Sequence, residues 1–143
     1  MTDRPGEPGR FRYRTFVRYA DVDQQGVVFN AHYLTYCDTA IDLWWRSLGL
    51  EWGDRGWECM VVKAVLEWKG SAAYADELDI EVGVDRWGTT SFDVGFRGWV
   101  DESPVFTCTT TYVGIRMGTR ETMPIPDDFK ALLSGGSVAP PAP

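Results

Sequence analysis

The sequence predicts an α+β fold in which one curved antiparallel sheet of about five strands wraps a long central helix. One segment, residues 30–48, has apolar side chains at a helical period and is too apolar to face solvent. It is preceded by one strand-like segment and followed by a series of others rich in β-branched and aromatic residues. Because such a helix must be buried, the sheet has to curl around it.

The first predicted strand spans residues 10–19, where apolar side chains alternate with arginines. A period of two with one apolar side is typical of a half-buried strand. The basic side is either a solvated face or part of an interface. Its members are Arg10, Arg12, Arg14 and Arg18.

The helix is predicted to begin with Asn30 as its N-cap and to end at Gly49, a residue suited to the C′ position. Asp42 and Arg46 stand four residues apart on its polar side, which predicts a surface pair contributing ~0.3 kcal/mol. The apolar side of the helix contains Tyr33, Cys37, Ala40, Ile41, Trp44 and Leu48.

Four further strands are predicted at residues 57–69, 77–87, 90–100 and 104–117. The connections between them are short, which favours an antiparallel meander. A short helix is expected within residues 126–133, with Pro126 near its start. Residues 10–133 therefore form one predicted domain. Residues 1–9 and 134–143, rich in Pro and Gly, are expected to be flexible tails.

Composition narrows the classes of function. A net charge of −7 argues against nucleic-acid binding, and no apolar run reaches the ~20 residues of a membrane span. The N-terminus lacks the apolar stretch of a secretory signal, so a cytoplasmic location is expected. The cysteines, Cys37, Cys59 and Cys108, are widely spaced and predict core thiols rather than disulfides or a metal site. No cofactor is expected. The many aromatic residues, 14% of the chain, favour a homo-oligomer.

The turn before the helix carries the candidate chemistry. Asp23 precedes Gly26, which permits a tight turn, and Val27, Val28 and Phe29 then lead to Asn30. The first amides of a helix lack intrahelical acceptors and lie at the positive end of its dipole, where they stabilise an oxyanion. A carboxylate and an oxyanion donor that face one point are a minimal hydrolytic site.

Structural alternatives remain open on these arguments. Asp21 and Asp23 before a glycine are common turn residues, and Asn30 is equally well explained as a helix cap. The single histidine, His32, is interpreted as a partly buried hydrogen-bonding group rather than a base. Nothing in the sequence brings a serine near it, so a Ser-His-Asp triad is not expected.

The stretch RYADVDQQGVVFNAHYLTYCDTA, residues 18–40, resembles the signature of the hotdog-fold acyl-CoA thioesterases of the 4-hydroxybenzoyl-CoA thioesterase type. Two further segments, SAAYADELDIEV and PIPDDFKALL, extend the resemblance over nearly the whole chain. The residues that fit the signature are Asp21, Asp23, Gly26, Val28, Phe29, Asn30 and Tyr33.

The resemblance implies a hotdog fold and hydrolysis of an acyl-CoA thioester. It assigns Asp23 as nucleophile or general base and the backbone N–H of Asn30 as the group that polarises the carbonyl. Gly26, Val28, Phe29 and Tyr33 would line the substrate. Asp21 fits the signature but is interpreted as a turn organiser, so Asp21→Asn is expected to cost far less activity than Asp23→Asn. The resemblance implies an obligate dimer with the site at the subunit interface. A homodimer is therefore expected here, with a tetramer of two dimers as the alternative.

The phosphates of coenzyme A need cations, and Arg86, Arg116 and Arg120 are the candidates. The chain departs from the family on the helix, where Asp38 and Ile41 replace a frequent Glu and Arg. A thioesterase acting on acyl-carrier proteins and a non-catalytic acyl-binding protein therefore remain alternatives. A dehydratase is less favoured, because it would need an Asp–His pair at another spacing. The aromatic content is compatible with an aryl or a medium-chain acyl group.

Overall fold

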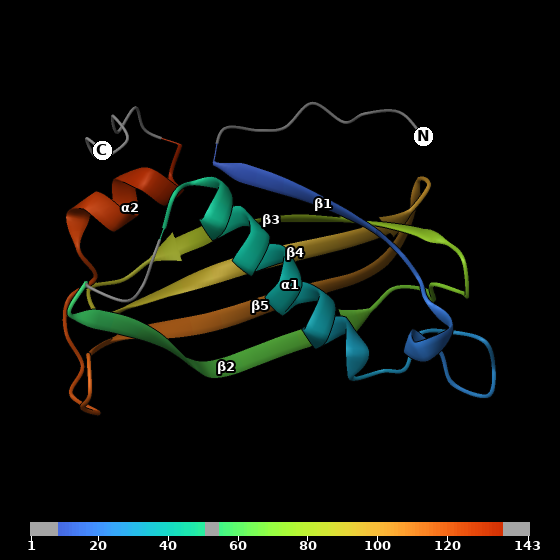
Figure 1. Cartoon of the computed structure of the whole chain (residues 1–143), viewed down its shortest axis with the longest axis horizontal. Coiled ribbons are helices and arrows are strands. Elements are labelled where there is room, and N and C mark those ends of the chain that lie inside the picture. The colour runs from blue at the N-terminus through green and yellow to red at the C-terminus, as the bar shows by residue number, and fades with distance from the viewer. Residues whose placement is uncertain (1–8, 51–54, 136–143) are drawn as a thin grey trace.

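The computed structural model describes residues 9–50 and 55–135 and confirms the predicted fold class (Figure 1). One five-stranded antiparallel sheet carries a long helix, α1, across one face, which is the arrangement of a hotdog fold. The predicted tails lie outside the described residues, except for residues 9, 134 and 135. The elements are β1 (Arg10–Phe16), η1 (Tyr19–Asp21, a 3-10 turn), α1 (His32–Ser47), β2 (Trp57–Trp68), β3 (Glu77–Trp87), β4 (Ser91–Val100), β5 (Ser103–Arg116) and α2 (Asp127–Leu133).

The core lies between α1 and the concave face of the sheet. Tyr33 packs against Phe106 of β5, with ring centroids 5.1 Å apart, and Cys37 and Cys108 are buried free thiols, as predicted. Phe129 of α2 closes the far end of the core against Trp57, at 5.0 Å between ring centroids. No helix within the described residues is long and apolar enough to cross a membrane.

The helix begins later than predicted. Ala31, not Asn30, occupies the N-cap position, and α1 starts at His32. The reason is a turn before the helix, in which the N–H of His32 donates to the carbonyl of Phe29 at 2.9 Å. The other end is as predicted, because Gly49 adopts a φ of +77° and follows the C-cap, Leu48. Asp42 and Arg46 form the expected exposed pair at 3.3 Å.

The predicted meander is wrong for one strand. The strand order is β1-β3-β4-β5-β2, so only β3, β4 and β5 form consecutive hairpins. β2 pairs with β5 along its whole length, from Trp57 opposite Arg116 to Trp68 opposite Phe106. The segment after β2 then crosses to β3, whose first residue lies opposite Phe16 of β1. A short connection in sequence therefore does not join neighbouring strands here.

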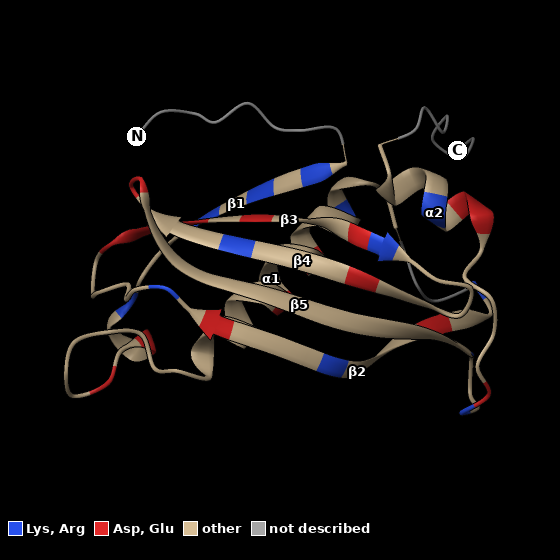
Figure 2. Cartoon of the chain, turned by 180° about the vertical axis from the view of Figure 1, so that it is seen from behind, with Lys and Arg blue, Asp and Glu red and all other residues tan. Residues whose placement is uncertain are grey.

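The two edges of the sheet differ in chemistry. The face of the sheet opposite α1 shows basic residues along β1 beside acidic residues on β3 (Figure 2). Arg10 pairs with Asp85 at 2.5 Å and Arg14 with Asp79 at 2.8 Å, so these arginines are bound within the sheet rather than only solvated. The β2 edge is mostly apolar, with Lys63 and Glu67 as its exposed charged side chains. Its exposed large apolar side chains, between 43% and 55% accessible, are Met60, Val61, Val62, Val65 and Trp68.

Candidate active site

The loop between η1 and α1 is a narrow hairpin closed by backbone hydrogen bonds. The N–H of Phe29 donates to the carbonyl of Asp21 at 3.0 Å, and the N–H of Asp23 donates to the carbonyl of Val27 at 2.9 Å. Gly26 stands at the tip with a φ of +76°, a conformation that L residues rarely adopt. The glycine predicted from the motif is therefore required by the backbone of this turn.

Asp23 lies on the exposed side of this loop. Its Oδ1 accepts the N–H of Gln25 at 2.8 Å, which is the Asx-turn that the sequence left open as an alternative. Within the described residues, Oδ2 of Asp23 accepts no hydrogen bond. One carboxylate oxygen thus holds the turn while the other remains available to a ligand.

Asn30 lies between the hairpin and the first residue of α1. Among the described residues neither its backbone N–H nor that of Ala31 has an acceptor, whereas the amides of Phe29 and His32 on either side are satisfied. This is the free, positively polarised amide expected near a helix N-terminus.

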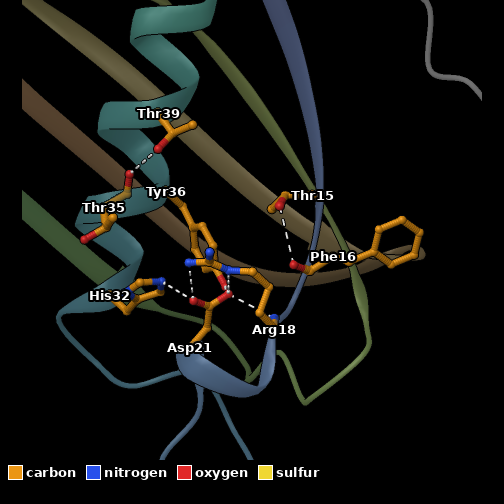
Figure 3. Close-up of polar contacts among 8 residues, drawn as sticks. All are labelled: Thr15, Phe16, Arg18, Asp21, His32, Thr35, Tyr36 and Thr39. Carbon is orange, nitrogen blue, oxygen red and sulfur yellow. Dashed lines mark hydrogen bonds and ion pairs between the residues drawn. The ribbon is translucent and has the colours of Figure 1, made fainter.

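Asp21 is the centre of a buried polar network (Figure 3). Its side chain is 1% exposed, and its Oδ2 receives the Arg18 backbone N–H at 2.9 Å and the Tyr36 hydroxyl at 2.8 Å. The guanidinium of Arg18 reaches both carboxylate oxygens, with Nη2 2.9 Å from Oδ1. Nε2 of His32 lies 2.8 Å from the same Oδ1. Asp21 therefore organises the η1 turn, as predicted, and also binds the first two turns of α1.

The network changes the ionisation of its members. Burial opposes the charge on Asp21, but hydrogen bonds from the side chain and backbone of Arg18 and from Tyr36, with His32 nearby, lower its pKa from 3.8 to about 2. Burial, followed by the hydrogen bond to Asp21, raises the pKa of Tyr36. Asp21 is therefore an anion at neutral pH and Tyr36 a neutral donor.

The predicted residues near the loop have different surroundings. Val28 is buried and its N–H donates to the carbonyl of Ala72 at 2.9 Å, whereas Phe29 is 56% exposed. Tyr33 is fully buried, and its hydroxyl accepts the N–H of Ala72 at 3.2 Å. Within one subunit, Val28 and Tyr33 thus tie the loop to the connection before β3, while Gly26 and Phe29 lie at its surface.

The candidate phosphate-binding arginines lie at the opposite end of the sheet. Arg86 is near the end of β3 and pairs with Asp93 at 2.8 Å, which lowers the pKa of that aspartate. Arg116 ends β5 and lies 3.6 Å from Glu121, and Arg120 is exposed in the following turn. The loop with Asp23 is at the other end, where β1 finishes (Figure 1). A single subunit does not bring the two sets together.

Sequence reasoning missed Tyr36 and the burial of Asp21. A signal was present, because His32 and Tyr36 stand four residues apart and so share one face of α1. His32 is partly buried, as predicted, with its side chain 21% exposed, but its Nε2 makes no hydrogen bond within the described residues. Among the described residues, no group of three or more His, Cys, Asp or Glu is arranged to hold a metal ion.

The fold and this loop together define a hotdog protein with an exposed carboxylate on the loop that leads into its central helix. Residues 17–133 match the family model described as the thioesterase-like superfamily. The chain therefore belongs to this superfamily, which confirms the family resemblance of residues 18–40.

Named relatives and solved structures agree with that assignment. A 1,4-dihydroxy-2-naphthoyl-CoA hydrolase of Synechococcus elongatus is 28% identical over 122 residues, covering 82% of this chain and 90% of the relative. The crystal structure of a 1,4-dihydroxy-2-naphthoyl-CoA thioesterase from Synechocystis has a TM-score of 0.79 at 22% identity, covering 87% and 95% of the two chains. A 4-hydroxybenzoyl-CoA thioesterase variant complexed with 4-hydroxybenzoyl-CoA has a TM-score of 0.80 at 20% identity, covering 87% and 99%.

Proposed function

We propose that this chain is an acyl-CoA thioesterase, which hydrolyses a thioester to a carboxylic acid and coenzyme A. The observation that carries the proposal is the loop itself. It displays an exposed carboxylate, Asp23, with one free oxygen, and ends at the unpaired amide of Asn30. Membership of the thioesterase-like superfamily, matched over residues 17–133, supports the same reaction and a single domain.

The proposed reaction uses Asp23 in one of two ways. As nucleophile, its oxygen attacks the thioester carbonyl, the C–S bond breaks, coenzyme A leaves as a thiolate, and water hydrolyses the resulting anhydride. As general base, it takes a proton from water while the water oxygen attacks the same carbonyl. In both cases the Asn30 N–H donates to the carbonyl oxygen as negative charge develops there. A thiolate leaves without strong acid help, so no histidine relay is needed.

We propose that the active protein is a dimer formed through the β2 edge. β2 presents an open backbone edge and mostly apolar side chains, whereas the β1 edge carries several arginines, which disfavour such pairing. The occupant that fits an open, apolar strand is a second copy of the same strand. A two-fold axis through β2 would join two sheets into one and cover Val62, which is 55% exposed in the single chain.

Two-fold pairing would also bring together the predicted site residues that lie at opposite ends of one subunit. Antiparallel β2 strands set the end of one strand beside the start of the other. The partner subunit's Arg116 and the partner subunit's Arg120 would then approach the end of the sheet that carries Asp23. Arg86 is already paired with Asp93 and is the weaker candidate for binding phosphates. We further propose a cytoplasmic location, which suits the three free thiols.

Thiol release from a panel of acyl thioesters tests the function. Hydroxylated aryl-CoAs come first, because the relatives bear the names of such thioesters. Medium-chain acyl-CoAs and the same acyl groups on a carrier protein follow. We expect at least one acyl-CoA to be hydrolysed, with Asp23→Asn as the inactive control. If neither CoA nor carrier thioesters are turned over, a non-catalytic acyl-binding protein is the better description.

A further inference from the structure

Asp21 is a buried carboxylate that the proposed reaction does not use. Among the described residues it is the most completely buried acidic side chain. A buried carboxylate is stabilised only when hydrogen bonds and opposite charges replace its lost hydration. Here all of them come from two places. Arg18 supplies the contacts from the segment after β1, and His32 and Tyr36 supply those from the start of α1.

The backbone of Asp21 adds a third connection. Its carbonyl accepts the N–H of Phe29 at 3.0 Å, which closes the neck of the hairpin. Asn30 therefore lies between two residues that contact Asp21: Phe29 through the backbone and His32 through the side chain. Asp23 is only two residues further along the opposite arm. The donor and the carboxylate of the proposed site are thus held by one common residue.

We propose that Asp21 is a positioning residue for the thioesterase site. It fixes the Asn30 amide relative to Asp23 by holding the neck of the hairpin against the first two turns of α1. The inference rests on the proposed function. It also replaces the expectation from the sequence that Asn would be tolerated at this position. Both carboxylate oxygens of Asp21 accept hydrogen bonds, from Arg18 and Tyr36, whereas an amide has only one acceptor oxygen.

His32 has a supporting part in this arrangement. Its Nε2 faces Asp21, and its ring packs edge-on against Tyr36 at 4.8 Å between centroids. The other charged or titratable groups around it are Arg18 and, from β1, Tyr13. None of these contacts points the imidazole at Asp23. His32 therefore orients the helix start and transfers no proton in the reaction.

Kinetics and amide hydrogen exchange of Asp21→Asn test the proposal. We expect kcat to fall at least ~10-fold while KM changes less than ~2-fold, because geometry at the reacting centre is lost rather than substrate binding. Exchange should accelerate at the amides of residues 22–34 and stay unchanged in β4 and β5. Asp79→Asn, which removes a carboxylate paired with Arg14 on the sheet, is the matched control and should alter neither kcat nor the exchange of the loop.

Tyr36→Phe keeps the ring and deletes one hydrogen bond, so it serves if Asp21→Asn does not fold. We expect a fall in kcat of ~3-fold with the same local exchange pattern. A folded Asp21→Asn variant with the kcat and loop exchange of the wild type would overturn the proposal. So would a folded Tyr36→Phe variant with both unchanged, if Asp21→Asn fails to fold.

A pair of substitutions at His32 separates positioning from proton transfer. His32→Gln keeps a polar side chain next to Asp21, so kcat should stay within ~2-fold and the pH–rate profile should keep its shape. His32→Leu removes the polar contact with Asp21 and should lower kcat. If His32→Gln loses one limb of the profile, His32 transfers protons and its supporting role is refuted. If the wild type releases no thiol from any thioester, the proposed function fails, and hydrogen exchange alone still decides whether Asp21 holds the loop.

Discussion

Asp21 and Asp23 are the same residue type, one residue apart, in opposite environments. Asp21 is 1% exposed and bound by Arg18, His32 and Tyr36, whereas Asp23 is exposed and uses one oxygen to hold a turn. The sequence motif contains both aspartates and does not show that their environments differ. The difference teaches that a paired acidic motif can divide its work: one carboxylate stabilises the loop, and the other is displayed by it.

The largest expected effect is on the exposed member of the pair. Asp23→Asn should lower the rate of thioester hydrolysis by at least ~10²-fold, because it removes the nucleophile or base while keeping the shape of the side chain. Thermal unfolding should change little, since an Asn oxygen can still accept the Gln25 N–H. Initial rates and a melting curve measure the two effects. A folded Asp23→Asn variant with the wild-type rate would refute the mechanism.

The next prediction asks whether Asp23 works in one subunit or needs a second. Val62→Glu places a charge near the middle of the apolar β2 edge, and like charges would face each other across a two-fold axis. We expect sedimentation to show monomers and the rate to fall by ~10-fold or more. Leu43→Glu, an exposed position on α1, is the control and should stay dimeric and active. An active monomeric Val62→Glu variant would show that one chain holds a complete site.

Asp21, the buried member of the pair, should make the free energy of unfolding depend on pH. Its pKa falls from 3.8 to about 2 on folding, which corresponds to about 2 kcal/mol at neutral pH. Because the folded-state pKa is the lower one, this stabilisation is complete above about pH 5 and is lost as the pH falls toward 2, with about half remaining at pH 3. Urea unfolding of the wild type and of Asp21→Asn should therefore converge in acid. Parallel curves from pH 7 to pH 3 would contradict this account.

The smallest effect is expected at the tip of the hairpin. Gly26 has a φ of +76° and open space where a Cβ would be, so Gly26→Ala meets backbone strain without a clash. We expect a loss of ~1 kcal/mol in the free energy of unfolding. Activity should fall more than stability suggests, because Asp23 lies on the same turn. Gly49→Ala, which is also unhindered at a φ of +77°, provides the control with equal strain far from the loop.

The elements could be predicted because they depend on local patterns. The period of two in residues 10–19 and the helical period after Asn30 both appear in the structure, with shifted ends. The pairing of β2 with β5 could not be predicted, because the alternation of side chains within a strand does not specify which strand lies beside it. The N-cap was misassigned because Asn suits several turn positions equally well.

The candidate site was also predictable only in part. Asp23, Gly26 and Asn30 could be assigned a place on one turn because they are close in sequence. The burial of Asp21 could not be foreseen, since it depends on Arg18 and Tyr36 meeting it from separate elements. The separation of Arg116 from the loop within one chain could not be predicted either, because it follows from the strand order.

That strand order has a consequence for folding. β3, β4 and β5 pair with their neighbours in sequence, whereas β1 and β2 pair with distant partners, such as Phe11 with Val82 and Leu66 with Cys108. Closing long loops is entropically costly, so the central hairpins should form first and both outer strands should dock late. The apolar β2 edge is then formed only after β5 has folded into the sheet. The apolar surface most prone to aggregation would thereby form last, when the subunit is ready to pair with a second copy.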